Sequence, residues 1–457
     1  MTAKSKYGSR VAKPAVLGRF AYHSPHRLTS LVVGHLRVVP LTTISRTWPL
    51  LLGMGVLMLG AGLQSTLLGI RATLEAFPTV VTGIVMACYY VGYLLGTIAA
   101  PRLILNVGHV RVFAALSAVA AAATLVQAAF VHPVSWAAMR LVTGLCFAGI
   151  YVVAESWLNG LATRTNRSRL FAVYMVVLYV GLGGAQFLLI LSSPGTSAPF
   201  MLVSGLICLA MVPTLLSSQM TPEVVVPRAV PFRELYRLSP LGVAAVIVAG
   251  VISSIIFSMG PVYARLEGLD TTAIATFMAV NIFAGVATQY PIGTLADRWD
   301  RRAVLAGVCA LATAAAGGIF AFPEMPRALF LALSAVFSGL ALTIYSLGIS
   351  HVNDRLEPAQ MVAASSALLL LNGAAAILGP VLASGLMSVR GPAAYFATLA
   401  TLSGALTLDC LWRKSRRAPV PQVDRGPFIR AQPQPCASVS EPTWLESRVD
   451  GPSVKAN

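Results

Sequence analysis

The sequence predicts an all-α polytopic membrane protein with twelve transmembrane helices. Of its 457 residues, 56% are hydrophobic and 11% are charged, whereas soluble domains carry roughly a quarter charged residues. The apolar residues form long runs. Residues 272–291 and 303–322 contain no charged side chain, and about 20 helical residues cross the hydrocarbon core of a bilayer. The short segment between them carries Arg298, Arg301 and Arg302, which indicates a cytoplasmic loop.

Twelve such runs follow one another along the chain. Six precede a polar, proline-rich stretch and six follow it, so we expect two six-helix halves. The predicted spans lie near residues 48–70, 79–100, 110–131, 134–159, 170–192, 197–217, 241–262, 272–295, 303–322, 327–350, 361–388 and 392–412.

The remaining segments divide the chain into five parts. They are a disordered basic N-terminal extension (1–46), an N-terminal six-helix half (47–217), a cytoplasmic central loop (218–240), a C-terminal six-helix half (241–412) and a disordered cytoplasmic tail (413–457). The extension lacks the apolar core of a signal peptide. Alternatively, translation starts near Leu41 and the upstream residues are not made.

The Arg residues of the loops predict the orientation. With the N-terminus inside, the even-numbered loops hold twelve Arg residues and the odd-numbered loops hold four. Positive residues gather in cytoplasmic loops, so we expect both termini in the cytoplasm. Because Arg far outnumbers Lys, as in GC-rich bacterial genomes, we expect a multi-pass protein of a bacterial inner (plasma) membrane.

The charge and the cysteines exclude several functional classes. The formal net charge is +17, but the basic residues lie in the two ends and the short loops and not on a soluble face, so we expect no nucleic-acid partner. The six cysteines have no metal-site or disulfide spacing. The chain also lacks a phosphate-binding Gly-x-x-x-x-Gly-Lys-Ser/Thr motif and an HExxH motif. We therefore expect no enzyme, no bound metal, no cofactor and no ATP-driven pump.

The charged loop between the eighth and ninth predicted spans has a known pattern. Residues 293–302 read Gly-Thr-Leu-Ala-Asp-Arg-Trp-Asp-Arg-Arg. This resembles the loop signature of the major facilitator superfamily, Gly-x-Leu-x-Asp-Arg-x-Gly-Arg-Arg, with Asp300 where glycine is usual. The corresponding loop of the first half, residues 101–111, matches less well, because Leu105 stands at the Asp position.

Other segments of the first half support the same resemblance. Arg140 to Gly144 is similar to the superfamily's Arg-x-x-x-Gly element, and residues 152–156, 166–170 and 174–181 resemble the YcaD-like branch. The resemblance covers residues 47–412. It implies the major facilitator fold, in which two six-helix halves rock about a central cavity.

Two charged residues fall inside the fourth predicted span. A charge at mid-bilayer costs about 2.5–3.5 kcal/mol on insertion scales, so Glu155 and Arg140 should face the protein interior. Burial favours the neutral form of a carboxyl group, which suits Glu155 to exchange a proton. Arg140 lies about 22 Å away along the helix, and it either influences that proton site or binds an anionic substrate. The alternative for both residues is a structural role between helices.

The charged loop is also a candidate for a conformational latch. A carboxylate such as Asp297 can dock at the N-terminus of a neighbouring helix. In the superfamily this loop is regarded as a latch that forms when the cytoplasmic side closes. The resemblance therefore implies a cytoplasmic latch, whereas a simple topology signal explains the Arg residues but not Asp297. The predicted latch residues are Gly293, Asp297, Arg298, Arg301 and Arg302.

Polar side chains are concentrated in particular spans. The third, sixth, ninth and twelfth spans are nearly bare, which matches the outer helices of the superfamily. In the other spans, Tyr, Gln, Ser and Asn predict a cavity for a small, moderately polar or amphipathic solute, with ordinary interhelical hydrogen bonds as the alternative. The predicted cavity residues are Gln64, Tyr89, Tyr93, Tyr174, Tyr179, Gln186, Ser254, Asn281, Gln289, Tyr345 and Asn372.

Together these features predict a secondary active transporter that works by alternating access and exports a small molecule in exchange for protons. Proton-driven uptake of a small metabolite is the alternative within this class. A receptor or scaffold on the same fold is the alternative outside it, and the costly intramembrane charges disfavour it. The expected partners are the small-molecule substrate, protons and the lipid bilayer, and we expect a monomer.

Overall fold

The architecture confirms the predicted fold class. The computed structural model describes residues 41–163, 166–216, 232–356, 358–416 and 428. Within these residues, twelve helices are long and apolar enough to cross a membrane, and no strand occurs. Most of the predicted extension, central loop and tail lies outside the described residues.

The first half consists of six long helices and one short 3-10 turn. The first helix runs from Leu41, and its apolar part, long enough to span a membrane, begins at Thr47, close to the predicted start of the first span. The elements are α2 (Leu41–Leu74), α3 (Thr79–Val107), α4 (His109–Ala129), α5 (Pro133–Leu161), α6 (Arg167–Leu188), η1 (Leu189–Leu191) and α7 (Ala198–Leu215).

The second half contains two features that the sequence reading did not predict. A short helix, α8, lies in the predicted central loop, and the eleventh span is broken at Ile377 into α13 and α14. Pro380 explains the break, because it offers no N–H to the carbonyl of Ala376 and its ring crowds that carbonyl. The elements are α8 (Phe232–Leu238), α9 (Pro240–Leu266), α10 (Thr271–Arg298), α11 (Arg301–Ala321), α12 (Arg327–Asn353), α13 (Pro358–Ala376), α14 (Leu378–Arg390) and α15 (Ala394–Arg416).

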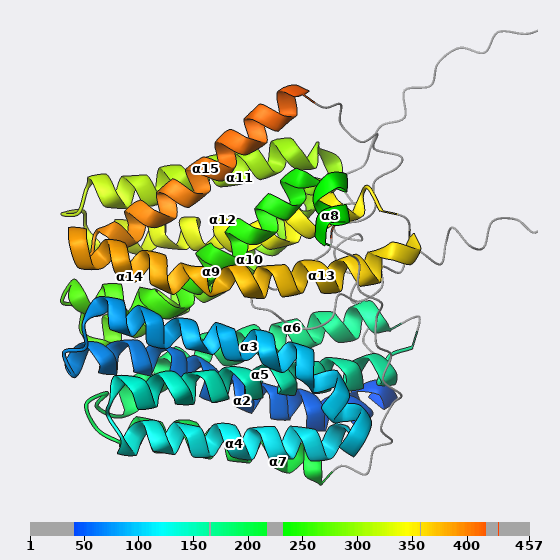
Figure 1. The fold of residues 1–457 in the computed structure, drawn as a ribbon, viewed down its shortest axis with the longest axis vertical. Helices are drawn as coiled ribbons and strands as arrows, with labels where there is room; N and C mark the ends of the chain where they lie inside the picture. Colours follow the sequence, from blue (N-terminus) through cyan, green and yellow to red (C-terminus); the bar gives the residue numbers. More distant parts are fainter. Residues whose placement is uncertain (1–40, 164–165, 217–231, 357, 417–427, 429–457) are drawn as a thin grey trace, which may run out of the picture.

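The two halves lie side by side with their long helices roughly parallel (Figure 1). Helices α4 and α7 pack on the outside of the first half, and α11 and α15 on the outside of the second. The interface between the halves is formed by α2, α3 and α6 on one side and by α9, α10, α13 and α14 on the other. Any site between the halves must therefore be built from these helices and their immediate neighbours.

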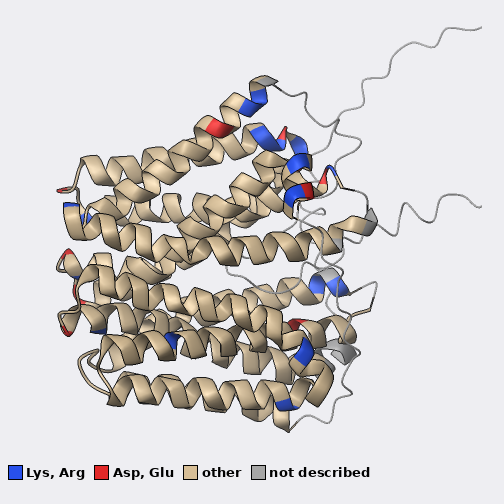
Figure 2. Ribbon diagram, viewed as in Figure 1, with Lys and Arg blue, Asp and Glu red and all other residues tan. Residues whose placement is uncertain are grey.

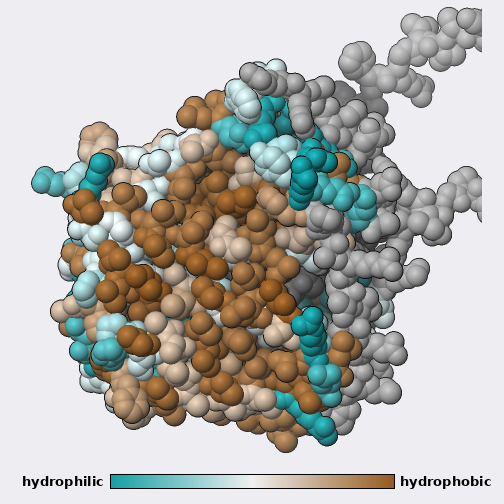
Figure 3. Space-filling view, viewed as in Figure 1, coloured by the Kyte–Doolittle hydropathy of each residue, from teal (hydrophilic) through white to brown (hydrophobic). Residues whose placement is uncertain are grey.

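Charged residues gather at the two ends of the helices and are rare between them (Figure 2). The beginning of α2 and the end of α15 lie at one end of the bundle, together with α8 (Figure 1). The helix bounds place Arg102, Arg111, Arg301, Arg302 and Arg355 at or near this end, which we call the basic end. A broad apolar band covers the visible face between the two ends (Figure 3), as expected of a surface in contact with lipid.

At the end opposite the basic end, the two halves pack against each other through small residues. Gly83 of α3 lies so close to Ser384 of α14 that an added Cβ would overlap its side chain. A Cβ on Gly69 of α2 would lie 3.1 Å from the Cβ of Pro261 and 3.3 Å from a methyl group of Val262, both in α9. Such contacts allow the helices of the two halves to approach closely at this end.

Candidate functional site

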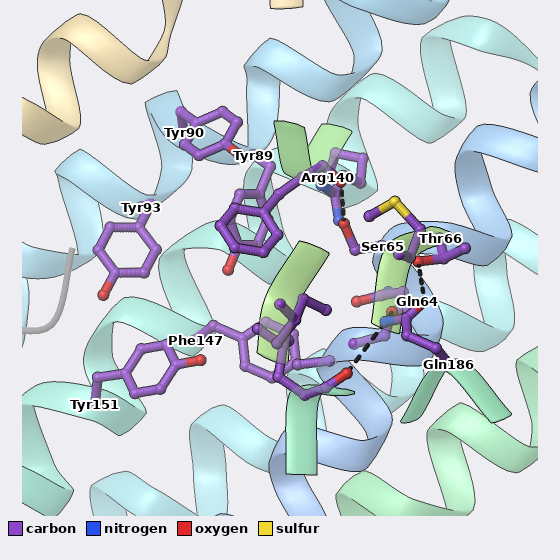
Figure 4. A pocket seen from close by; sticks show the side chains of 16 residues that line it. Gln64, Ser65, Thr66, Tyr89, Tyr90, Tyr93, Arg140, Phe147, Tyr151 and Gln186 are labelled. Carbon is purple, nitrogen blue, oxygen red and sulfur yellow. Dashed lines mark hydrogen bonds between the residues drawn. The ribbon is translucent and has the colours of Figure 1, made fainter. Parts of the chain in front are cut away.

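A cavity of about 50 Å³ lies between the two halves (Figure 4). Space of this size holds a few water molecules, so a larger solute can enter only when the halves separate. Four helices of the first half and two of the second supply the walls. The lining residues are Ala61, Gly62, Gln64, Ser65, Thr66, Tyr89, Tyr90, Tyr93, Arg140, Phe147, Tyr151, Leu182, Gln186, Phe257, Met278 and Ile282.

Close packing of α3 on α5 positions the charged wall of the cavity. A Cβ on Gly92 or Gly96 of α3 would overlap the backbone of α5, and one on Gly144 of α5 would overlap the backbone of α3. Because the two helices approach so closely, the ring of Tyr89 lies beside Arg140. The guanidinium carbon of Arg140 is 4.3 Å from the centre of this ring, which is a cation–π contact.

Aromatic side chains surround this contact. The ring of Tyr89 lies 5.4 Å from that of Tyr90 and 6.5 Å from that of Phe147, measured between centroids. The rings of Tyr93 and Tyr151 are 6.1 Å apart. Helices α3 and α5 therefore contribute an aromatic wall next to the buried cation, as the labelled side chains in Figure 4 show.

Hydrogen bonds fix the polar wall that α2 contributes. The Gln64 amide donates to Thr124 Oγ1 (2.9 Å) and to Gln127 Oε1 (3.1 Å). Thr66 Oγ1 donates to Gln186 Oε1 (2.7 Å). Gln64 and Gln186 therefore line the cavity and at the same time connect α2 to α4 and α6.

The second half contributes an apolar wall, formed by Phe257 of α9 and by Met278 and Ile282 of α10. A hydrogen bond crosses the cavity region between the halves, from Ser65 Oγ to the carbonyl oxygen of Phe257 (3.0 Å). The cavity is therefore asymmetric: its charge and most of its polar groups come from the first half.

The predicted cavity residues fall into two groups. Gln64, Tyr89, Tyr93 and Gln186 line the cavity. The others lie outside its lining, and their predicted contact with substrate stays a prediction. They are Tyr174, Tyr179, Ser254, Asn281, Gln289, Tyr345 and Asn372.

Several residues of the second group connect helices within the second half. Asn281 Oδ1 of α10 accepts a hydrogen bond from Ser334 of α12 (2.7 Å). The Asn372 amide of α13 donates to the carbonyl of Val246 in α9 (3.0 Å). In this conformation these side chains serve interhelical hydrogen bonding, the alternative that the sequence left open.

Sequence reasoning did not assign several residues to the lining, among them Ser65, Thr66, Tyr90, Phe147 and Tyr151. Helical spacing identifies two of them. Phe147 and Tyr151 follow the buried Arg of α5 by seven and eleven residues and therefore lie on the same face of the helix. The other three become apparent only once the rotation of α2 and α3 is known.

Glu155 lies on the same face of α5 as the lining residues, one helical turn beyond Tyr151 toward the basic end. Its side chain is 1% exposed, but it is outside the cavity lining. Arg140, which is 3% exposed, is inside it. The structure therefore separates the two predicted coupling residues: one lines the cavity, and the other lies between the cavity and the basic end.

The predicted latch residues gather where α10 ends and α11 begins. Arg301 donates to Asp354 Oδ1 (2.6 Å) and to the carbonyl of Ser350 (2.8 Å) at the end of α12. Nη2 of Arg301 lies 3.5 Å from Oδ1 of Asp297, and Nη2 of Arg302 lies 3.2 Å from Oδ2 of Asp300. These contacts join three helices of the second half.

Asp297 has a further partner from the C-terminal part of the chain. Its carboxylate accepts a hydrogen bond from the backbone N–H of Phe428 (2.8 Å). The ring of Phe428 lies against Gly293, where an added Cβ would be 2.8 Å from it. Arg298 is exposed. Among the residues that the structure describes, no group of three His, Cys, Asp or Glu side chains is placed to hold a metal ion.

The chain is similar in sequence to proteins of a transporter family. The family model described as Major Facilitator Superfamily matches residues 50–325 and 278–450. An uncharacterized MFS-type transporter of Enterobacter sp. (strain 638) is 30% identical over 83% of this chain and 99% of its own length. The uncharacterized MFS-type transporter YcaD of Escherichia coli O7:K1 is 29% identical over the same shares.

Solved structures share the fold at lower sequence identity. The nucleoside transporter NupG matches with a TM-score of 0.65 at 13% identity, over 81% of this chain and 99% of that chain. A bacterial homologue of the human lysosomal transporter Spinster, solved in an inward-facing and unoccupied conformation, matches with a TM-score of 0.65 at 15% identity, over 83% and 96%.

Proposed function

This chain belongs to the major facilitator superfamily, and we propose that it is a secondary active transporter that exports a small molecule in exchange for protons. The observation that carries the proposal is the cavity between the halves. Both halves contribute walls to it, and its volume is about 50 Å³. A solute can enter and leave such a site only if the halves move relative to each other, which is alternating access.

The packing at the end opposite the basic end supports this mechanism. Gly69 and Gly83 bring helices of the two halves into contact there, so this end is closed. A hydrogen bond from Ser65 to the carbonyl oxygen of Phe257 links the halves at the cavity. Contacts between small residues can separate at low cost, as rocking requires.

We propose Glu155 as the site of the coupled proton. A buried carboxyl group between the cavity and the basic end can load a proton from one side and release it to the other as access changes. Its position one turn beyond Tyr151 connects it to the cavity through the shared face of α5. Substrate and proton would then occupy neighbouring positions on one helix.

We further propose that the basic end faces the cytoplasm of a bacterial cell and that the protein functions as a monomer in the inner membrane. The excess of Arg residues at this end supports the orientation. Asp297 and Arg301 lie there as well, so we propose that the loop around them acts as a cytoplasmic latch between the open and closed states.

Transport is tested with purified protein in proteoliposomes that have an acidic lumen and enclose a pH-sensitive dye. A panel of metabolites and drugs is added outside. If solute enters in exchange for protons, the lumen becomes more alkaline. A more acidic lumen indicates co-transport and supports uptake instead, and no response to any solute contradicts the proposed transport. Protein-free liposomes control for passive permeation of weak acids.

The proton site is tested in the same vesicles with Glu155→Gln, which keeps the shape of the side chain and removes the titratable group. We expect solute-driven pH changes to vanish while solute exchange persists. Glu234→Gln, at an exposed position of α8, is the matched control and should behave like the parent. Unchanged proton movement in Glu155→Gln assigns this residue a structural role.

A further inference from the structure

Arg140 is a buried cation that has no acidic partner in the described part of the chain. Its side chain is 3% exposed, and its Nε atom makes no hydrogen bond to any described residue. None of the ion pairs within the described ranges involves it. Its guanidinium group lies over the face of the Tyr89 ring. Arg140 is also the only charged residue among those that line the cavity.

The cation–π contact with Tyr89 leaves the donors of Arg140 available to a ligand. An arginine is always protonated in proteins, and its planar guanidinium presents several N–H groups along its edge. The Tyr89 ring meets the guanidinium with its face and does not occupy the N–H groups as a carboxylate or carbonyl oxygen would. This edge matches the two oxygens of a carboxylate or phosphate group, which it can bind bidentately.

A helix-packing role does not account for this arrangement. An arginine that only joins helices would donate to backbone carbonyls, as Arg301 does to Ser350. No such bond from Arg140 occurs within the part of the chain that the structure describes. A buried charge without a partner is costly, and a ligand that supplies the partner removes this cost.

The other walls indicate what the rest of the ligand is like. Around the charge lie the rings of Tyr89, Tyr90 and Phe147, and the opposite wall carries Phe257 and Met278. These surfaces favour an apolar or aromatic body. We propose that the substrate is an organic anion, with a carboxylate or phosphate group bound by Arg140 and an apolar or aromatic body against these rings. This inference rests on the proposed transport function and specifies its substrate class.

Binding to purified protein in detergent tests the charge requirement with matched pairs of probes. Benzoate and hexanoate are compared with benzamide and hexanamide, which have similar shapes but no charge, and phenyl phosphate tests the second type of anion. Dissociation constants are measured for the parent, for Arg140→Gln and for Arg140→Lys. Arg71→Gln is the control, because Arg71 lies outside the cavity and pairs with Glu75.

We expect at least one anion to bind the parent and its neutral counterpart not to bind. Arg140→Gln should weaken this binding tenfold or more, Arg140→Lys should weaken it less because the charge remains, and Arg71→Gln should leave it unchanged. Equal binding of acid and amide, binding of none of the anions, or undiminished binding by Arg140→Gln overturns the inference. If Arg140→Gln does not fold, the parent and Arg140→Lys still provide the first two comparisons.

Flux measurements distinguish this inference from the proposed function. A parent protein that binds anions through Arg140 but moves none of them in proteoliposomes contradicts transport and leaves the anion site intact. A parent that transports a neutral or cationic solute, with the same rate in Arg140→Gln, contradicts the anion site and leaves transport intact.

Discussion

Breaking the ion pair between Arg301 and Asp354 should strongly destabilise the basic end, because a buried charge would be left without its partner. Nη1 of Arg301 lies 2.6 Å from Oδ1 of Asp354, and each of the two side chains is 3% exposed. Removing one partner of a buried pair costs about 3–5 kcal/mol. We expect Asp354→Asn to cost about 3 kcal/mol, the lower end of this range, because Arg301 still donates to the Ser350 carbonyl.

Asp297 belongs to the same ion-pair network as Asp354, but its removal should affect stability much less. It lies 3.5 Å from Arg301 and its side chain is 46% exposed, and exposed pairs contribute less than about 1 kcal/mol. Asp297→Asn should therefore leave the unfolding equilibrium within about tenfold of the parent, whereas Asp354→Asn should shift it by roughly a hundredfold.

Equilibrium unfolding by SDS in mixed micelles, followed by circular dichroism, measures both effects. A double-mutant cycle with Arg301→Gln isolates the interaction, because residues in direct contact are not additive. We expect the double variant, Arg301→Gln with Asp354→Asn, to lose less stability than the sum of the two single losses. Additive losses, or equal losses for Asp297→Asn and Asp354→Asn, would refute the reasoning.

Three further predictions concern helix packing, orientation and the N-terminus. Gly144→Ala should lower the free energy of unfolding by about 1–3 kcal/mol through overpacking. Gly205→Ala, where a Cβ meets open space, should be neutral or slightly stabilising in the same unfolding assay. Equal effects of the two substitutions contradict the close contact of α3 and α5. Reporter fusions within residues 218–240 should report a cytoplasmic location, and a periplasmic signal overturns the proposed orientation. Translation from Leu41 should preserve membrane insertion and transport, because residues 1–40 lack an apolar run long enough to span a membrane; loss of either contradicts this.

Much of the fold was predictable because the length and hydropathy of each apolar run identify it as a membrane span. The twelve predicted runs correspond to the twelve candidate spans of the structure. Helix breaks that depend on backbone hydrogen bonding were harder to predict from the sequence. Pro380 was visible in the sequence, but whether a proline bends a helix or divides it depends on its surroundings, and here it separates α13 from α14.

The candidate site was predictable in part. Polar residues in the spans indicated a cavity, and Gln64, Tyr89, Tyr93 and Gln186 do line it. Hydropathy does not say which neighbour a polar side chain will meet, however. Asn281 bonds to Ser334, 53 residues away in the chain, and only the three-dimensional packing of α10 on α12 shows that it is outside the cavity lining.

The central claim, that the two halves rock about the cavity, is tested most directly by locking the closed end. A Cβ on Gly69 would lie 3.3 Å from a methyl carbon of Val262. The Cβ of Val262 is one bond from that carbon, so the two Cβ atoms lie near the separation of about 3.5–4.5 Å that a disulfide needs. Gly69→Cys and Val262→Cys are combined after the six native cysteines have been replaced. Gly69→Cys alone is the control for oxidation.

The measurement is the flux, in proteoliposomes, of a solute selected by the proton-exchange screen, with the number of free thiols determined in parallel. Alternating access predicts that oxidation abolishes flux in the double-cysteine protein, that a reductant restores it, and that the single-cysteine control is unaffected. Undiminished flux in protein whose two cysteines are fully joined would contradict the account.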